Sequence, residues 1–196
     1  MTLTAYPLVA AAVRSSPGKL LYEDSSMNQP SEMLVVEWTG SKRFCTVLYP
    51  YAVGAPEPAI EMISGDSAGR INDADWVSAG NLETRRTVGP LTHQSEYTVI
   101  RERGGSFPAL LMVFGNDCSV GSHSIASTKP ITVSLDGLRG AIVNERPDTL
   151  VEIRSPEIKS GDCFLLDGRV VTASETGLLP LPLTRPGEHH IGVGPR

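Results

Sequence analysis

The sequence predicts an all-β protein, a two-layer antiparallel β-sandwich of roughly a dozen strands with little helix. Three observations lead to this fold class. Short apolar runs recur with Gly-, Pro- or Asp-rich turn signals between them. Several runs alternate between apolar and polar residues, as Ile131–Asp136 does, which is the period of a half-buried strand. No segment sustains the 3.6-residue apolar period of a helix that packs on a core.

The stretch Met33–Tyr51 has the clearest strand pattern, and the expected fold is organised around it. Two apolar runs, Met33–Trp38 and Arg43–Tyr49, flank a polar turn at residues 39–42, which predicts a β-hairpin with a four-residue loop. The second run is apolar on both faces, as a central strand covered on both sides would be. Pro50 lacks a backbone donor, so regular pairing is expected to end there.

The other strands are expected in chain order between turns at residues 65–70, 104–105, 136–137, 161–162 and 167–168. Ala109–Phe114 is apolar on both faces and is expected to be central and buried, and Ile131, Val133 and Leu135 are expected to face inward. The predicted strands are Tyr6–Val13 (or a short helix), Lys19–Tyr22, Ala59–Ser64, Ile71–Val77, Leu82–Val88, Ser95–Glu102, Ala109–Phe114, Ile131–Asp136, Leu138–Val143, Thr149–Arg154, Cys163–Leu166, Arg169–Ala173 and Glu188–Val193.

Length and composition limit the architecture and the partners. A chain of 196 residues fits one large sandwich, and we expect an N-terminal segment, residues 1–32, that packs on a domain of residues 33–196. The net charge of −5 argues against a nucleic-acid partner. No apolar run approaches the ~20 residues of a membrane span, and Leu8–Val13 lacks the basic region that would precede it in a secretion signal.

Three cysteines, Cys45, Cys118 and Cys163, lie far apart and lack the spacing of zinc ligands. Cys45 and Cys163 lie in apolar runs and are expected to be buried thiols, and one disulfide among the three stays open. Cys118 and His123 are close in a predicted loop, CSVGSH, but no third group is evident to orient the histidine as a base. No cofactor and no metal site are predicted.

The segment Gly65-Asp66-Ser67-Ala68-Gly69 matches G-x-S-x-G, the nucleophile elbow of α/β-hydrolases. The residues after it make a poor helix start, and the crossover helices of a hydrolase sheet are missing. We therefore favour a β-turn on the surface, and a serine hydrolase that uses Ser67 is a secondary alternative. Asn72, Asp73 and Asp75 do not complete a calcium-binding pattern and are expected to form a solvated loop.

His189 and His190 are adjacent, so a strand would turn them to opposite faces and they could not chelate one ion together. Because Ile191 and Val193 mark the inner face, His189 is expected to point inward and His190 outward. The aromatic residues Trp38, Tyr49, Tyr51 and Trp76 could form a surface on which a sugar stacks, although core packing is the commoner use of such side chains.

Several stretches together resemble the C-terminal β-sandwich of heparinase II/III-like polysaccharide lyases. They are RFCTVLYPY followed by APEPAIEMI, then SFPALLMVFGN, KPITVSLDG, LVEIRSP with CFLLDGRVV, and the closing PGEHHIGV. These pieces span most of Met33–Val193 and consist of strand and turn patterns. In that family most of the lyase chemistry belongs to an α/α toroid that precedes the sandwich, and none of its catalytic residues has a counterpart here.

The resemblance implies an accessory sandwich that supports a catalytic toroid, in the same or a separate chain, and borders a cleft for an acidic polysaccharide. A periplasmic or extracellular location would follow for a lyase. No catalytic residue is assigned, and the candidate glycan contacts are Tyr49, Tyr51, Trp76 and His190. The main alternative is a free-standing carbohydrate-binding module, which would bind glycan without a helical partner.

Overall fold

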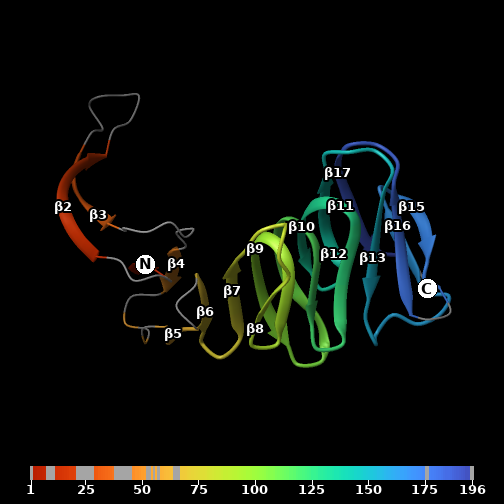
Figure 1. Cartoon of the computed structure of the whole chain (residues 1–196), viewed down its shortest axis with the longest axis horizontal. Helices are drawn as coiled ribbons and strands as arrows, with labels where there is room; N and C mark the ends of the chain where they lie inside the picture. Colours follow the sequence, from red (N-terminus) through yellow and green to blue (C-terminus); the bar gives the residue numbers. More distant parts are fainter. Residues whose placement is uncertain are drawn as a thin grey trace.

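The structure is a computed structural model that describes residues 2–7, 12–20, 29–37, 46–51, 54, 56, 58–63, 67–174 and 177–194, with side chains from residue 54 onward. The described residues form strands and turns, and none of them is helical (Figure 1). The strands are β1 Thr2–Pro7, β2 Ala12–Leu20, β3 Gln29–Glu37, β4 Thr46–Tyr51, β5 Ile60–Met62, β6 Ala68–Ile71, β7 Asp75–Ala79, β8 Arg86–Val88, β9 Leu91–Arg103, β10 Ser106–Val120, β11 His123–Asp136, β12 Arg139–Asn144, β13 Thr149–Arg154, β14 Cys163–Leu166, β15 Arg169–Thr172, β16 Leu178–Leu183 and β17 Gly187–Val193.

Thirteen strands, β5 to β17, form one open antiparallel sheet in the order β15-β14-β17-β12-β11-β10-β9-β7-β6-β5. This order names ten of the thirteen strands, and the other three, β8, β13 and β16, branch from it. Strand β13 pairs with β11 and β16, and β8 pairs with β9. The branching occurs because the long central strands change partners along their length. The first part of β11, residues 124–127, pairs with β13, whereas residues 131–136 pair with β12.

A bend in β10 makes this change of partners possible. The register of β10 shifts between Met112 and Gly115 and again between Gly115 and Asp117, and Phe114 between them has a φ of 45°. Such bulges bend a strand and increase its twist. A Cβ atom at Gly115 would lie 2.5 Å from the Cβ of Ser95, so only glycine allows β9 and β10 to approach this closely.

The folded sheet encloses one main core. Its buried side chains come from both branches, for example Ile142 on β12 and Leu181 on β16, both with no exposed surface. Ile131, Val133 and Leu135 are at most 3% exposed, as their alternation predicted. The all-β class, the antiparallel two-layer arrangement and the small helix content are therefore confirmed for the described residues.

The central strand β10 is buried on one face only, which corrects the expectation for Ala109–Phe114. Leu110 and Met112 are buried, but Leu111 between them is 38% exposed. The apolar run did predict the central position of this strand, because β10 lies between β9 and β11. Its second face is the outer surface of the sandwich.

The predicted hairpin of Met33–Trp38 with Arg43–Tyr49 is wrong. Strand β3 pairs with β2, and β4 pairs with β1, in two separate two-stranded sheets. Trp38 and residues 43–45 lie outside the described residues. Strands β3 and β4 both lie outside the thirteen-stranded sheet, so that sheet is not organised around Met33–Tyr51. The division into residues 1–32 and 33–196 stays a prediction.

The structure differs from the sequence-based expectations at three other places. Strand β16, with the sequence LLPLPL, was not predicted because Pro180 and Pro182 break strands, but β16 pairs on one side only, where missing N–H donors are tolerated. The CSVGSH segment is a hairpin rather than a loop, with Val120 opposite His123. Strand β6 begins at Ala68, within the range 65–70 that was expected to be a turn, and a turn occupies residues 72–74.

The Asp-Gly hairpins were predicted correctly. Asp136 pairs with Arg139 across the first turn and Leu166 pairs with Arg169 across the second. Asp167 and Gly168 have φ values of 50° and 78°, the left-handed conformation that a two-residue hairpin loop requires. In the part of the chain that the structure describes, no helix is long and apolar enough to cross a membrane.

Candidate anion-binding site

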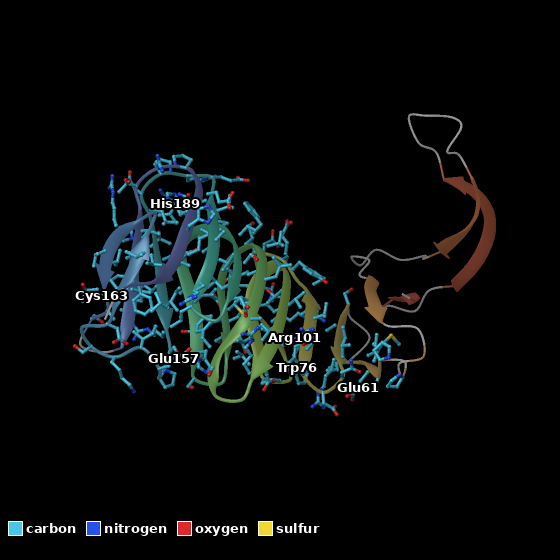
Figure 2. All side chains as sticks on the ribbon, turned by 180° about the vertical axis from the view of Figure 1, so that it is seen from behind. Glu61, Trp76, Arg101, Glu157, Cys163 and His189 are labelled. Atoms are coloured by element: carbon cyan, nitrogen blue, oxygen red, sulfur yellow. The ribbon has the colours of Figure 1, made fainter. Side chains whose placement is uncertain are left out.

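A pocket lined by both charged and apolar side chains lies beside the β14–β15 hairpin. It has a volume of about 400 Å³ and receives side chains from β14, β15, the segment after β16, and β17. Leu166, Val170, Val171 and Pro182 supply apolar walls, and Asp167, Arg169, Thr184, Arg185 and His189 supply the polar groups. Figure 2 shows His189 on its strand near one end of the molecule.

Asp167 joins the hairpin turn to β17 through three hydrogen bonds. Its Oδ1 accepts the backbone N–H of His190 at 2.8 Å, its Oδ2 lies 2.7 Å from His189 Nδ1, and its own N–H donates to the carbonyl of His190 at 2.9 Å. The backbone N–H of His190 is the main reason that the pKa of Asp167 lies below its usual value, and the contact with His189 acts in the same direction. The carboxylate is therefore ionised at neutral pH.

The histidine is held at both ring nitrogens. His189 is 3% exposed, and its Nε2 lies 3.0 Å from the carbonyl oxygen of Arg185, which also accepts a bond from Asn144 Nδ2. A carbonyl and a carboxylate oxygen can only accept, so both contacts are complete when both ring nitrogens carry a proton. Both ring nitrogens of His189 are therefore engaged by oxygen atoms of the protein, and its role in the pocket is positional.

Two arginines give the pocket its excess positive charge. Arg185 is 73% exposed and reaches Asp167 Oδ2 only at 3.9 Å, and the guanidinium of Arg169 has no hydrogen bond or ion pair with any described residue. Asp167 is the one carboxylate that lines the pocket. A guanidinium group binds carboxylate, sulfate or phosphate with paired N–H donors. The arrangement can therefore bind an anionic group beside an apolar wall.

The predicted glycan contacts do not gather at one place. His190 is 73% exposed and His189 is buried, so the predicted alternation of the pair is confirmed. Trp76 is 9% exposed, and its Nε1 donates to Glu102 at 2.7 Å. The sheet order places four strands between β7, which carries Trp76, and β17, which carries His190. The side chains of Tyr49 and Tyr51 lie outside the described part of the structure.

The hydrolase alternative lacks its structural context. Ser67 has a φ of 60°, as a strained turn would, but strand β6 follows it directly instead of a helix. Ser67 is 4% exposed, so the expectation of a surface turn is wrong for this residue. Its carbonyl accepts the N–H of Ala79, which ties the turn to β7.

Asn72 and Asp73 lie exposed in the turn after β6, but Asp75 is 6% exposed and begins β7, so the expected solvated loop is wrong for Asp75. Asn72 Oδ1 accepts the backbone N–H of Ala59 at 2.9 Å, Asp73 pairs with Arg70, and Asp75 accepts two bonds from Arg101, each 2.6 Å long. Among the described residues no group of three His, Cys, Asp or Glu side chains could hold a metal ion.

Cys118 and Cys163 are free thiols, and Cys45 lies outside the described residues. Cys163 is half-buried rather than buried. Cys118 is 2% exposed, and burial raises the pKa of its thiol well above the usual value, so it is not a nucleophile at neutral pH. His123 lies on the neighbouring strand, and its Nδ1 contacts Ser155 instead of the thiol.

Sequence reasoning missed Asp167, Arg169 and Arg185 as site residues. Asp167 was assigned only a turn, and each arginine is isolated in the sequence. One signal in the sequence could have indicated Arg169. It follows a two-residue turn directly, so it pairs with Leu166, and two residues that pair in this way point to the same face of a sheet.

No protein-family model matches the chain, and no curated protein sequence is significantly similar to it.

Proposed function

We propose that this chain is the accessory β-sandwich of a heparinase II/III-like polysaccharide lyase, and that the pocket with Arg169 and Arg185 borders the path of its acidic glycan. The observation that carries the proposal is that two arginines and a single carboxylate line one pocket beside apolar walls. A uronate offers a matching pair of features, a carboxylate and an apolar ring face. The stretches that resemble the family lie on strands β4, β5, β10, β11, β13–β15 and β17.

A catalytic partner domain would need a surface to dock on, and the outer face of the sheet offers one. Val99 pairs with Leu111 across β9 and β10, and both point away from the main core. Leu111 and Val143 are 38% and 39% exposed. Leu111 lies on β10 and Val143 on β12, with β11 between them, and half-exposed apolar side chains on one face of a sheet favour contact with another domain.

The double variant Arg169→Gln/Arg185→Gln tests the glycan contact. We expect it to bind oligouronates about tenfold or more weakly than the unaltered chain, because each guanidinium contributes charge-assisted hydrogen bonds. Isothermal titration calorimetry with an alginate tetrasaccharide measures the affinity, and cellotetraose serves as the neutral ligand. Higher salt should weaken binding of the alginate tetrasaccharide, because both arginines are exposed to solvent.

Arg139→Gln is the matched control, since Arg139 is exposed on β12 and does not line the pocket. Equal affinity of the double variant and the control would contradict the proposed contact. Tight binding of the glycan by the chain alone would favour the alternative of a free-standing carbohydrate-binding module.

The chain alone is expected to be inactive as a lyase. Elimination of a uronate requires a base near the α proton and a group that neutralises the carboxylate, held in one cleft. In this pocket the arginines could neutralise charge, but both nitrogens of His189 are already engaged. Incubation with alginate or heparan sulfate should give no rise in ultraviolet absorbance from unsaturated uronate. A steady rise with the purified chain would reveal a complete active site.

A further inference from the structure

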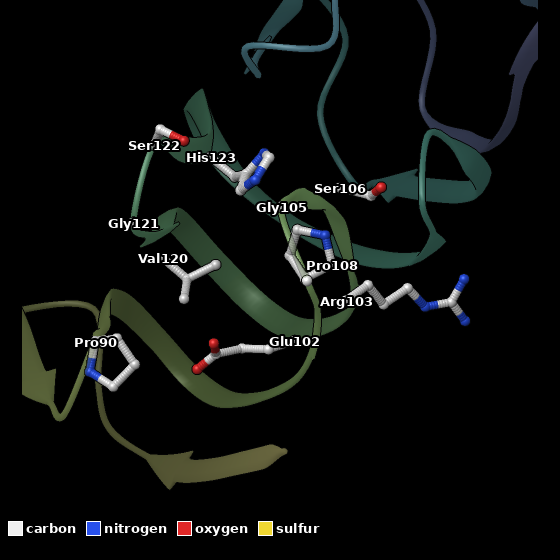
Figure 3. A pocket seen from close by; sticks show the side chains of 11 residues that line it. Pro90, Glu102, Arg103, Gly105, Ser106, Pro108, Val120, Gly121, Ser122 and His123 are labelled. Carbon is white, nitrogen blue, oxygen red and sulfur yellow. The ribbon is translucent and has the colours of Figure 1, made fainter. Parts of the chain in front are cut away.

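A second pocket lies between two hairpin turns that are far apart in the sequence. It has a volume of about 260 Å³ and opens between the turn at residues 104–105 and the turn at residues 121–122. Figure 3 shows His123 and Glu102 at opposite sides of this pocket, with Val120 and Pro108 between them. The bend in β10 brings the two turns to the same end of the sandwich.

A chain of hydrogen bonds fixes the imidazole of His123. Its Nδ1 lies 3.0 Å from Ser155 Oγ, which lies 3.4 Å from Glu157 Oε1. The same carboxylate oxygen accepts the backbone N–H of Phe107 at 2.6 Å. The ring of Phe107 packs edge-to-face against the imidazole, with ring centroids 5.6 Å apart. His123 is thus held by β10 on one side and by the segment after β13 on the other.

The bonding pattern selects one tautomer of His123. The carboxylate of Glu157 can only accept, so the single hydroxyl proton of Ser155 is needed for the bond to Glu157. His123 Nδ1 must then donate its proton to Ser155, which completes both bonds. In the other tautomer the oxygens of Ser155 and Glu157 would face each other with no proton between them. In the neutral imidazole the network therefore leaves the lone pair on Nε2 of His123.

That lone pair is open to the pocket. Nε2 of His123 bonds to no described residue, and it is not among the buried polar atoms that lack a partner. His123 itself lines the pocket, although only 9% of its surface is exposed. The geometry thus presents a fixed hydrogen-bond acceptor inside a small, partly apolar space.

The charge of the pocket favours a cation. Glu102 uses Oε1 to accept the indole N–H of Trp76, which is neutral, and no described cationic side chain pairs with it. The guanidinium of Arg103 is neutralised by Asp136. Pro90, Pro108 and Val120 supply apolar walls. The pocket therefore combines an unneutralised carboxylate, a lone-pair nitrogen and an apolar lining.

We propose that this pocket binds a small organic molecule that carries a primary ammonium group. The ammonium donates to Glu102 and to His123 Nε2, and the carbon skeleton packs against the prolines and Val120. An ammonium has three donors and no acceptor, which complements two acceptors. This site is separate from the arginine pocket, shares no lining residue with it, and carries the opposite charge.

Cyclohexylamine and cyclohexanol test the proposal, because they share a ring and differ in the charged group. The full chain is titrated with each at neutral pH, and the imidazole resonances of His123 are followed by two-dimensional NMR. We expect saturable shifts with cyclohexylamine and an affinity for cyclohexanol about tenfold or more weaker. Equal affinity for the two compounds, or no saturation with the amine at millimolar concentrations, would overturn the proposal.

Glu102→Gln is the decisive variant, because an amide oxygen can still accept the bond from Trp76 while the charge is removed. We expect it to weaken amine binding about tenfold, whereas Glu61→Gln, which removes an exposed carboxylate on β5, should leave binding unchanged. An unchanged affinity in Glu102→Gln would contradict the proposal. Nitrogen chemical shifts of His123 in the free chain must also show an unprotonated Nε2, and a protonated one would refute the assigned tautomer.

Discussion

Lowering the pH from about 7 to 4 is expected to reduce the free energy of unfolding by about 3 kcal/mol through His93 alone. This residue has no exposed surface, and burial, followed by the nearby Arg86 guanidinium, lowers its pKa to about 4. An unfolded histidine has a pKa near 6.5, so between these two values the unfolded chain binds a proton that the folded chain does not. The stabilisation is complete above about pH 6.5 and is lost progressively down to about pH 4.

The surroundings of His93 explain why the neutral ring is preferred. Nδ1 lies 2.7 Å from Ser95 Oγ and Nε2 lies 2.9 Å from Ser78 Oγ, and both serines are fully buried. Hydroxyl groups can donate to one ring nitrogen and accept from the other, so the neutral imidazole satisfies both. A Cβ at Gly80 would lie 2.8 Å from the ring, so the backbone of Gly80 packs directly against the imidazole.

Urea unfolding followed by tryptophan fluorescence measures this dependence. His93→Gln is expected to be less stable at neutral pH but to lose little further stability between about pH 6.5 and 4, because glutamine does not titrate. His190→Gln is the control, since His190 is 73% exposed and should leave the pH dependence unchanged. A decline of equal size in His93→Gln and in the unaltered chain would assign the effect to other groups.

Sequence patterns predicted the local elements better than their partners. Alternation identified Ile131–Asp136, and the Asp-Gly pairs identified two hairpins, because both signals depend only on neighbouring residues. Strand pairing depends on distant parts of the chain. The apolar run Met33–Trp38 contains a strand, but the adjacent run is not its partner. Nothing local distinguishes a hairpin from two strands that pair elsewhere.

The candidate sites were harder to predict for the same reason. The arginine pocket joins Arg169 on β15 to Arg185 before β17, and the amine pocket joins Glu102 on β9 to His123 on β11. His123 was considered as a partner for Cys118, five residues away, whereas its actual partner is Ser155, 32 residues away. The bend in β10 brings Glu102 and His123 to one pocket, and the pairing of β13 with β11 brings Ser155 to His123. Neither feature is visible in a local pattern.

Replacing Phe107 by alanine is expected to lower the free energy of unfolding by about 3–5 kcal/mol. Phe107 is 1% exposed and is the largest fully buried side chain among the residues that the structure describes. It packs in the main core at the start of β10 and supports the imidazole of His123. Because neighbouring strands are paired on both sides of β10, they cannot collapse into the space that the ring leaves.

Two substitutions make this expectation specific to the cavity. Phe107→Leu fills part of the space and should cost less, and Leu111→Ala, on the exposed face of the same strand, should cost about 1 kcal/mol or less. Urea unfolding measures the free energy of unfolding of all three variants. If the alanine variant at Phe107 does not fold, Phe107→Leu can still be compared with Leu111→Ala. Equal costs for Phe107→Leu and Leu111→Ala would mean that the ring is not enclosed. The His123 resonances should also broaden in Phe107→Leu, because the imidazole loses the packing that, together with Ser155, fixes its orientation.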